Sequence, residues 1–118
     1  MNQQEKLKGI RARCVELLAL AEKRTEGRWA DCPETLDNGR LFNTINARDS
    51  FVVHVCSTTH VHEDARFIAS CAGPAEAGWK ATIAAIDLMF AMHGLAGIDI
   101  YALDATGDII AAWPEELL

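Results

Sequence analysis

Two long stretches of the sequence repeat apolar residues at the spacing of an α-helix, and the segment between them does not. In residues 3–24 the apolar positions follow one another at steps of three and four, which predicts an amphipathic helix. Those positions are Leu7, Ile10, Cys14, Leu17, Leu18 and Ala21. The stretch has no aromatic residue to anchor it at a membrane surface, so we expect it to pack on a core. Thr25 and Gly27 are expected to end the helix.

The second helical stretch covers about residues 75–93 and follows a shorter helix at 63–72. Gly73-Pro74 separates them, because proline blocks the continuation of a helix but suits the first turn of a new one. In the shorter helix we expect Phe67, Ile68 and Cys71 to be buried. The longer helix carries a stripe that is more typical of a core than of a cofactor pocket. The stripe contains Trp79, Ile83, Ile86 and Phe90, and is widened by Leu88, Met89 and Met92.

The segment between the helical stretches has the signals of turns and strands. Pro33 and the Asn38-Gly39 pair mark turns, and two β-prone runs follow, at residues 41–46 and 51–57, with "ARDS" as the loop between them. Neither face of the run 51–57 is strongly polar, which predicts a central strand covered on both sides.

The last segment, "GIDIYALDATGDIIAAW", is interpreted as a β-hairpin. Residues 98–103 and 109–113 would be its strands, and "DATGD" its turn. The predicted fold is therefore α+β, with a long N-terminal helix, a small antiparallel sheet, a helix pair and a C-terminal hairpin. We expect residues 1–118 to form one domain. A homodimer is one way to cover an exposed edge strand of such a hairpin.

Composition and charge exclude several classes of protein. Half of the residues are hydrophobic, which is enough for a core, but no run of about 18 apolar residues predicts a membrane span. The N-terminus is charged where a secretory signal is apolar, so we expect a cytoplasmic protein whose four cysteines are reduced. The net charge is −6. Residues 1–28 have a net charge of +3, residues 29–118 one of −9, and no Lys or Arg follows Lys80. We therefore expect no direct binding to nucleic acid, which needs basic residues against phosphate.

Four residues within a short stretch have the chemistry of metal ligands: His54, Cys56, His60 and His62. Imidazole and thiolate are the natural ligands of zinc, and four of them complete a tetrahedral site. Their spacing matches no standard zinc signature. The alternative is a histidine and a cysteine on a strand near the core, followed by loop histidines, and we favour it. No metal or other cofactor is therefore expected.

Other candidate chemistry has an ordinary structural explanation in each case. Cys56 or Cys71 could act as a nucleophile only with a base and an orienting group in reach, and free cysteines are more often buried. Glu63 and Asp64 stand at a predicted helix start, where acidic residues are stabilised by the helix dipole. Asp104 and Asp108 flank a predicted turn. No phosphate-binding glycine motif is present. We therefore expect no catalytic site.

Two short motifs resemble a family of small phage and prophage proteins, the Ead/Ea22-like proteins. The first is a Thr-x-Gly-x-Trp element and the second is a "DAxFIA" helix start. The resemblance covers the arrangement of about residues 7–92, and the C-terminal segment has no counterpart in it. It implies a phage or prophage accessory protein that acts inside a bacterial cell, and no catalytic residues carry over. The matching residues are Thr25, Gly27, Trp29, Asp64, Ala65, Phe67, Ile68 and Ala69.

Three functional hypotheses follow. The first is a non-enzymatic phage protein that binds the basic surface of a host protein and inhibits or modulates it, with an anti-CRISPR or anti-defence role as the specific version. The second is a small-ligand-sequestering protein or metal-dependent enzyme with a pocket near His54, Cys56, His60 and His62. The third is a structural component of a phage. In the first, the partner-binding residues are acidic: Asp99, Asp104, Asp108, Glu115 and Glu116.

Overall fold

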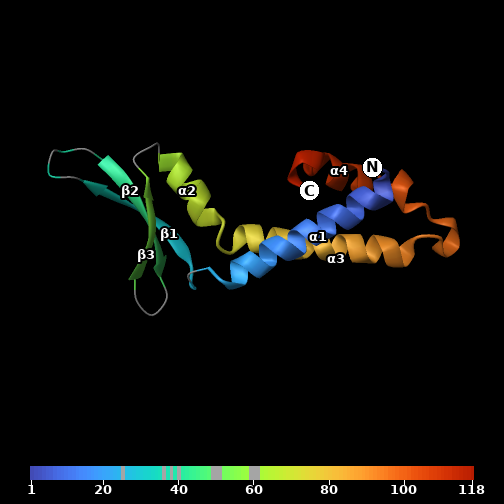
Figure 1. The fold of residues 1–118 in the computed structure, drawn as a ribbon, viewed down its shortest axis with the longest axis horizontal. Coiled ribbons are helices and arrows are strands. Elements are labelled where there is room, and N and C mark those ends of the chain that lie inside the picture. The colour runs from blue at the N-terminus through green and yellow to red at the C-terminus, as the bar shows by residue number, and fades with distance from the viewer. Residues whose placement is uncertain (25, 36, 38, 40, 49–51, 59–61) are drawn as a thin grey trace. The chain divides into compact units, whose positions relative to one another are not determined.

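The computed structural model of the chain describes residues 1–24, 26–35, 37, 39, 41–48, 52–58 and 62–118. Short 3₁₀ turns lie before and after the last α-helix, at Leu95–Gly97, Ile100–Ala102 and Glu115–Leu117. The predicted α+β class is confirmed (Figure 1). In chain order the helices and strands are α1 (Gln3–Glu22), β1 (Trp29–Thr35), β2 (Leu41–Arg48), β3 (Val52–Thr58), α2 (His62–Ser70), α3 (Pro74–Met92) and α4 (Asp104–Ala112).

Contacts among the described residues divide the chain into two compact units. The helical unit contains residues 1–20 and 78–118, and the sheet unit contains residues 21–77. The helical unit is thus built from two segments that are far apart in the sequence, whereas the sheet unit is one continuous segment. The expectation of one domain over residues 1–118 stays a prediction.

The core of the helical unit forms where α1 packs against α3 and the C-terminal segment. Leu7, Ile10 and Cys14 of α1 and Ile86 of α3 are completely buried. Burying a leucine or isoleucine fully contributes about 1.5–3 kcal/mol, so these positions carry much of the unit's stability. The predicted stripes are confirmed here in part: Leu7, Ile10 and Cys14 of the first stripe are buried, and the four central residues of the second pack in this core. The partly buried residues around this cluster are Trp79, Ile83, Phe90, Tyr101, Ile109, Ile110 and Trp113.

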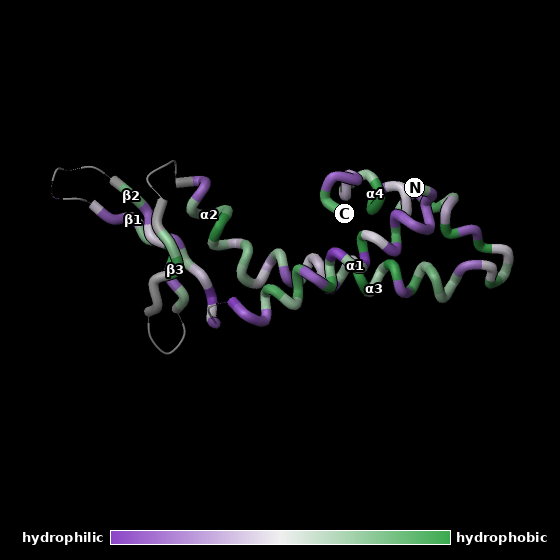
Figure 2. Tube along the Cα trace, viewed as in Figure 1, coloured by the Kyte–Doolittle hydropathy of each residue, from purple (hydrophilic) through white to green (hydrophobic). Residues whose placement is uncertain are grey.

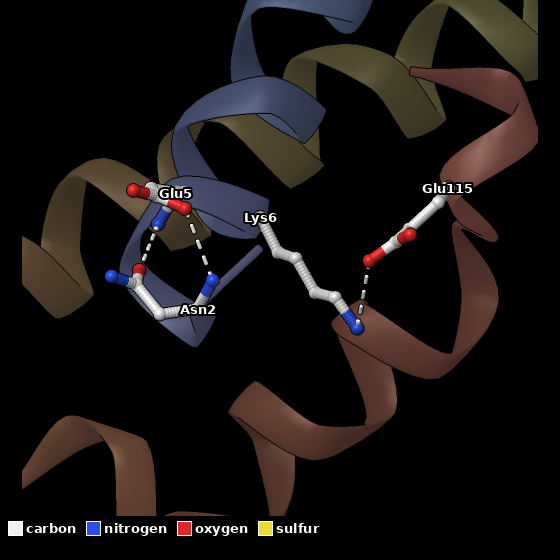
Figure 3. Close-up of polar contacts among 4 residues, drawn as sticks. All are labelled: Asn2, Glu5, Lys6 and Glu115. Atoms are coloured by element: carbon white, nitrogen blue, oxygen red, sulfur yellow. Dashed lines mark hydrogen bonds and ion pairs between the residues drawn. The ribbon is translucent and has the colours of Figure 1, made fainter.

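The start of α1 is closed by a reciprocal pair of hydrogen bonds (Figure 3). The side-chain oxygen of Asn2 accepts from the amide of Glu5 at 2.8 Å, and the carboxylate of Glu5 accepts from the amide of Asn2 at 3.1 Å. This is a capping box, which satisfies amides that a helix start leaves free. One residue later, Lys6 forms an ion pair of 3.6 Å with Glu115. The pair links α1 to the end of the chain within the helical unit.

The sheet unit consists of three antiparallel strands in the order β1-β2-β3, with α2 packed on one face. Trp29 pairs with Ala47, Asn43 pairs with Thr58, and the β2–β3 register shifts between Ile45 and Asn46. The buried cluster under α2 is small. It contains Ile45, Ala65 and Ala69, with Trp29, Val55, Cys56 and Ile68 packed around it.

Two predictions about the strands were wrong. No strand was predicted before residue 41, but Pro33 lies within a strand, β1, at the edge of the sheet. A sheet edge is where proline is tolerated, because its missing amide costs no ladder hydrogen bond. The run 51–57 was predicted to be the central strand, but the central strand is β2. The run at 41–46 and residues 52–57 of the second run are confirmed as strands. In the predicted loop between them, Ala47 and Arg48 belong to β2, whereas residues 49 and 50, like Asn38 of the predicted turn, lie outside the described residues.

The C-terminal hairpin was also wrong. Residues 100–102 form a 3₁₀ turn and Asp104–Ala112 form α4, with Gly107 inside the helix rather than in a turn. The three alanines of α4 suit a helix, and its paired isoleucines, Ile109 and Ile110, pack on the core of the helical unit. An isolated hairpin has no such core and is only marginally stable. Residues 104–112 therefore form a helix although the local sequence was interpreted as part of a β-hairpin.

The side of α2 that faces the sheet differs in part from the prediction, since Ile68 packs against the buried cluster as expected but Phe67 and Cys71 do not. Ala65, Ala69 and Ala72 are buried, whereas Phe67 is 72% exposed and Cys71 is exposed. Ala65 and Ala69 are four residues apart and share one face, which places Phe67 on another. Small side chains let the helix approach the sheet closely, so alanines take the buried positions.

In α3, Leu88 was expected in the core stripe but is 60% exposed.

Among the described helices, none taken singly is long and apolar enough to cross a membrane. Helix α3 together with residues 95–112 meets the length and hydropathy needed only as a pair bent by 109°.

Candidate functional site

The histidine and cysteine candidates do not come together as a described metal site. Cys56 is half-buried and packs against the small cluster under α2. It pairs with Ile45 across the β2–β3 ladder, and His54 pairs with Asn46. His60 and the side chains of His54 and His62 lie outside the described residues. Within the described part of the chain, no group of three histidine, cysteine or acidic residues could hold a metal ion.

The nucleophile candidate Cys71 and the core residue Cys14 have environments that differ strongly. Cys71 is exposed, and its thiol donates a hydrogen bond to the carbonyl oxygen of Phe67 at 3.6 Å. A carbonyl oxygen cannot act as the general base that a cysteine nucleophile needs. Cys14 is buried in the core, and this burial raises the pKa of its thiol, which disfavours the reactive thiolate. Neither environment activates the sulfur.

Glu63 and Asp64 lie where a structural role explains them. Both are exposed and stand in the first turn of α2. Carboxylates in this position are stabilised by the free amides at the helix N-terminus. The interpretation of this pair as a helix start is confirmed.

The predicted partner-binding acids all lie at the surface of the helical unit. Asp99 accepts a hydrogen bond from the amide of Tyr101 at 3.0 Å, and Glu115 pairs with Lys6. The other three make no ion pair with any residue that the structure describes. Two of them, Asp104 and Asp108, are four residues apart on α4 and therefore lie on the same side of that helix. We call the five residues the acidic surface: Asp99, Asp104, Asp108, Glu115 and Glu116.

The charge of the chain is concentrated in the C-terminal segment. Residues 81–118 hold six acidic residues and no Lys or Arg, whereas residues 1–80 hold eleven of each sign. The net charge of −6 is therefore that of residues 81–118. Two of the six acids pair with cations of α1: Asp87 with Arg11 and Glu115 with Lys6. The remaining negative charge faces solvent.

The Arg11–Asp87 pair is a two-point contact between α1 and α3. The Nε and Nη2 atoms of Arg11 donate to the two carboxylate oxygens of Asp87 at 2.7 and 3.1 Å. The hydrogen bond with Arg11 lowers the pKa of the Asp87 carboxyl, and the same contact raises the pKa of Arg11. Both side chains remain substantially exposed to solvent, at 42% and 51%, so the pair contributes little to stability.

The sheet unit has a pocket that is separate from the histidine candidates. Its volume is about 430 Å³, and its lining includes Arg28, Trp29, Asp31, Arg66 and Ser70. Two guanidinium groups are suited to an anionic group, but the carboxylate of Asp31 lies in the same lining. Cys56 does not line this pocket, and the pocket expected near His54 and Cys56 stays a prediction.

One residue with several structural contacts was missed by sequence reasoning. Arg24 pairs with the carboxylate of Glu76, donates to the carbonyl oxygen of Gly27 at 2.9 Å, and lies 5.6 Å from the ring centre of Trp29. The Thr-x-Gly-x-Trp element was noted only as part of a resemblance. Its glycine and tryptophan both contact Arg24, so the element has a structural role in the sheet unit.

In comparison with known proteins, no protein-family model, curated protein or solved structure matches the chain.

Proposed function

We propose that the chain is a non-enzymatic binding protein of phage origin, which acts in the cytoplasm of a bacterial host by docking its acidic surface on the basic surface of a host protein. One observation carries the proposal. Residues 81–118 have six acidic residues and no basic one, and Asp104, Asp108 and Glu116 are exposed without an ion-pair partner among the described residues.

The physical reason is that unpaired exposed carboxylates act on a partner at long range. A surface of one sign steers a partner of the opposite sign towards it and repels wrong partners. Nucleic acids and anionic membranes carry the same sign as this surface, so a basic protein is the favoured partner. The helical unit presents these charges on a packed core, which limits the entropy lost on binding.

The phage origin and the anti-defence role rest on the resemblance to Ead/Ea22-like proteins. Nucleases and CRISPR effectors hold nucleic acid on basic surfaces. An acidic protein that occupies such a surface competes with the nucleic acid and thereby inhibits the effector. This is the specific version of the proposal, and the partner would be a defence nuclease complex of the host.

The experiment is quantitative affinity capture from a lysate of the bacterial host, at low and at moderate salt. The test variant is Asp108→Lys with Glu116→Lys, since both residues are exposed and make no ion pair in the described structure. The control variant is Glu34→Lys with Asp37→Lys, which makes the same change in charge at exposed positions of the sheet unit.

A basic host protein should be captured by the wild type and by the control variant, and should be lost with the test variant. Its capture should weaken as salt rises, because salt screens exposed charges. Capture that is insensitive to salt, or that is equal for the two double variants, would contradict the proposal. Circular dichroism should show that both variants keep the helix content of the wild type.

A further inference from the structure

Helix α3 has two apolar faces, and the described chain covers only one of them. The covered face contains Ile83, Ile86 and Phe90, which pack in the core of the helical unit. On the other side of the helix, four exposed residues follow one another at steps of three, four and three, so they form one face. We call it the outer face: Ala81, Ala84, Leu88 and Ala91.

This arrangement is unusual for a helix at a protein surface. Such a helix normally has one apolar stripe and a polar opposite side, whereas a helix that is hydrophobic all round is normally buried. Leu88 is 60% exposed at the centre of the outer face, and Figure 2 shows hydrophobic residues along much of the length of α3. An exposed apolar surface of this kind is typical of an interaction site.

Two charged residues beside the outer face indicate what covers it. Lys80 and Asp87 are seven residues apart, so they flank the face on the same side, with opposite signs. When two such helices pack antiparallel, the same flanks oppose each other, and Lys80 of one copy meets Asp87 of the other. In a parallel pair, Lys80 and Asp87 would instead face the other flank of the second helix. That flank holds only Gly78, Ala85 and Met92.

We propose that the outer face of α3 is a homodimer interface, in which two copies of the chain pack antiparallel with Lys80 of each against Asp87 of the other. The arrangement is two-fold symmetric, as homodimer interfaces commonly are. The alanines let the two helices approach closely, and Leu88 supplies most of the apolar area. The proposal uses none of the residues of the acidic surface and does not depend on the proposed function.

Both charged residues can make the additional pair. Lys80 is exposed and makes no ion pair with any residue that the structure describes. Asp87 already accepts two hydrogen bonds from Arg11, but its side chain is 51% exposed, and a carboxylate has about four acceptor sites. Asp87 would therefore bridge Arg11 of its own chain and Lys80 of the second copy.

The first test compares two leucines of nearly equal exposure, using sedimentation equilibrium of the full chain. Leu88 is 60% exposed on the outer face, and Leu20 is 63% exposed on α1. The wild type should dimerise, and Leu88→Gln should raise the dimer dissociation constant at least about tenfold, because each copy loses a buried leucine. Leu20→Gln should leave the constant unchanged.

The second test uses the charges to identify the antiparallel pairing. Lys80→Asp and Asp87→Lys should each be monomeric alone, since like charges then oppose each other. Mixed in equal amounts, they should form a heterodimer, because each opposes a charge of the other sign. Lys8→Asp makes the same charge change at an exposed position of α1 and should still dimerise. Arg11→Gln removes the pair within the chain and should dimerise too.

Three outcomes would overturn the proposal. The wild type could be monomeric at every concentration measured. It could dimerise without any effect of Leu88→Gln. The mixture of Lys80→Asp with Asp87→Lys could fail to associate although Leu88→Gln weakens the dimer, which would exclude the antiparallel pairing. A monomer that binds phosphatidylcholine vesicles, and loses this binding in Leu88→Gln, would instead assign the outer face to lipid.

Discussion

At the scale of single residues, Thr106 is the clearest case of a polar side chain in a structural role. It is completely buried, and its hydroxyl donates to the carbonyl oxygen of Ile100, itself buried. The sulfur of Met89 lies 3.6 Å from the same hydroxyl. Thr106 therefore ties α4 to the preceding 3₁₀ turn and holds both against α3.

Replacing Thr106 by valine keeps the shape of the side chain but removes the donor. The carbonyl oxygen of Ile100 would keep the amide of Leu103 as a donor, at 3.3 Å, but would lose the hydroxyl, and the net loss of one hydrogen bond costs about 0.5–1.5 kcal/mol. We expect Thr106→Val to lower the free energy of unfolding by that amount in urea denaturation. Thr82→Val is the matched control, since the Thr82 hydroxyl only bonds back to Gly78 within α3 at 2.9 Å. Equal losses in the two variants would contradict the role of Thr106.

At the scale of the elements, α4 contains a glycine that the helix does not need. Gly107 does not have a positive φ, and a Cβ atom built there would meet nothing within 4 Å. Gly94, which follows α3, has a φ of 82°, a conformation that a side chain disfavours. The two glycines therefore differ in what an added methyl group would do.

We expect Gly107→Ala to raise the free energy of unfolding by about 0.5–1 kcal/mol, because alanine loses less backbone entropy in a helix than glycine does. Gly94→Ala should lower it, since its backbone is left-handed. Thermal unfolding followed by circular dichroism distinguishes the two. A fall in melting temperature for Gly107→Ala would contradict the assignment of residues 104–112 as a helix.

The same elements show which local patterns were sufficient for prediction. The ends of α1 and α3 are each within two residues of the prediction, because their periodicity is long and Pro74 marks a boundary. The capping box of Asn2 and Glu5 has a sequence signature that would have placed the start of α1. In contrast, no strand was predicted around Pro33, and residues 98–103 were predicted to be a strand. Both errors arose in short segments, whose secondary structure depends on the elements that pack against them.

At the scale of the whole molecule, the helical unit depends on segments from both ends of the chain. The C-terminal segment places Tyr101, Ile109, Ile110 and Trp113 around the buried residues of α1 and α3. The last five residues, 114–118, contain no buried side chain. The contribution of the C-terminal segment should therefore end before Pro114.

Removing residues 99–118 should expose the buried side of α1 and lower the melting temperature strongly, with binding of a hydrophobic dye. Each large apolar side chain that leaves the core removes about 1.5–3 kcal/mol, a large part of the stability of a small protein. Removing only residues 114–118 should have a small effect, since it takes away the exposed Lys6–Glu115 pair. Similar melting temperatures for the two shortened chains would contradict this account of the core.

The sequence by itself determined the α+β class, the long helices and the uneven charge. These are local properties: helical periodicity and the sign of a side chain do not depend on what lies nearby. Only the tertiary structure decided which apolar residues are buried. Ala65 and Ala69 face the sheet instead of Phe67, and Ile86 is buried while Leu88 is exposed. The outer face of α3 could be identified only from the exposure of its residues in the tertiary structure. Burial depends on which surfaces meet and how closely their side chains pack.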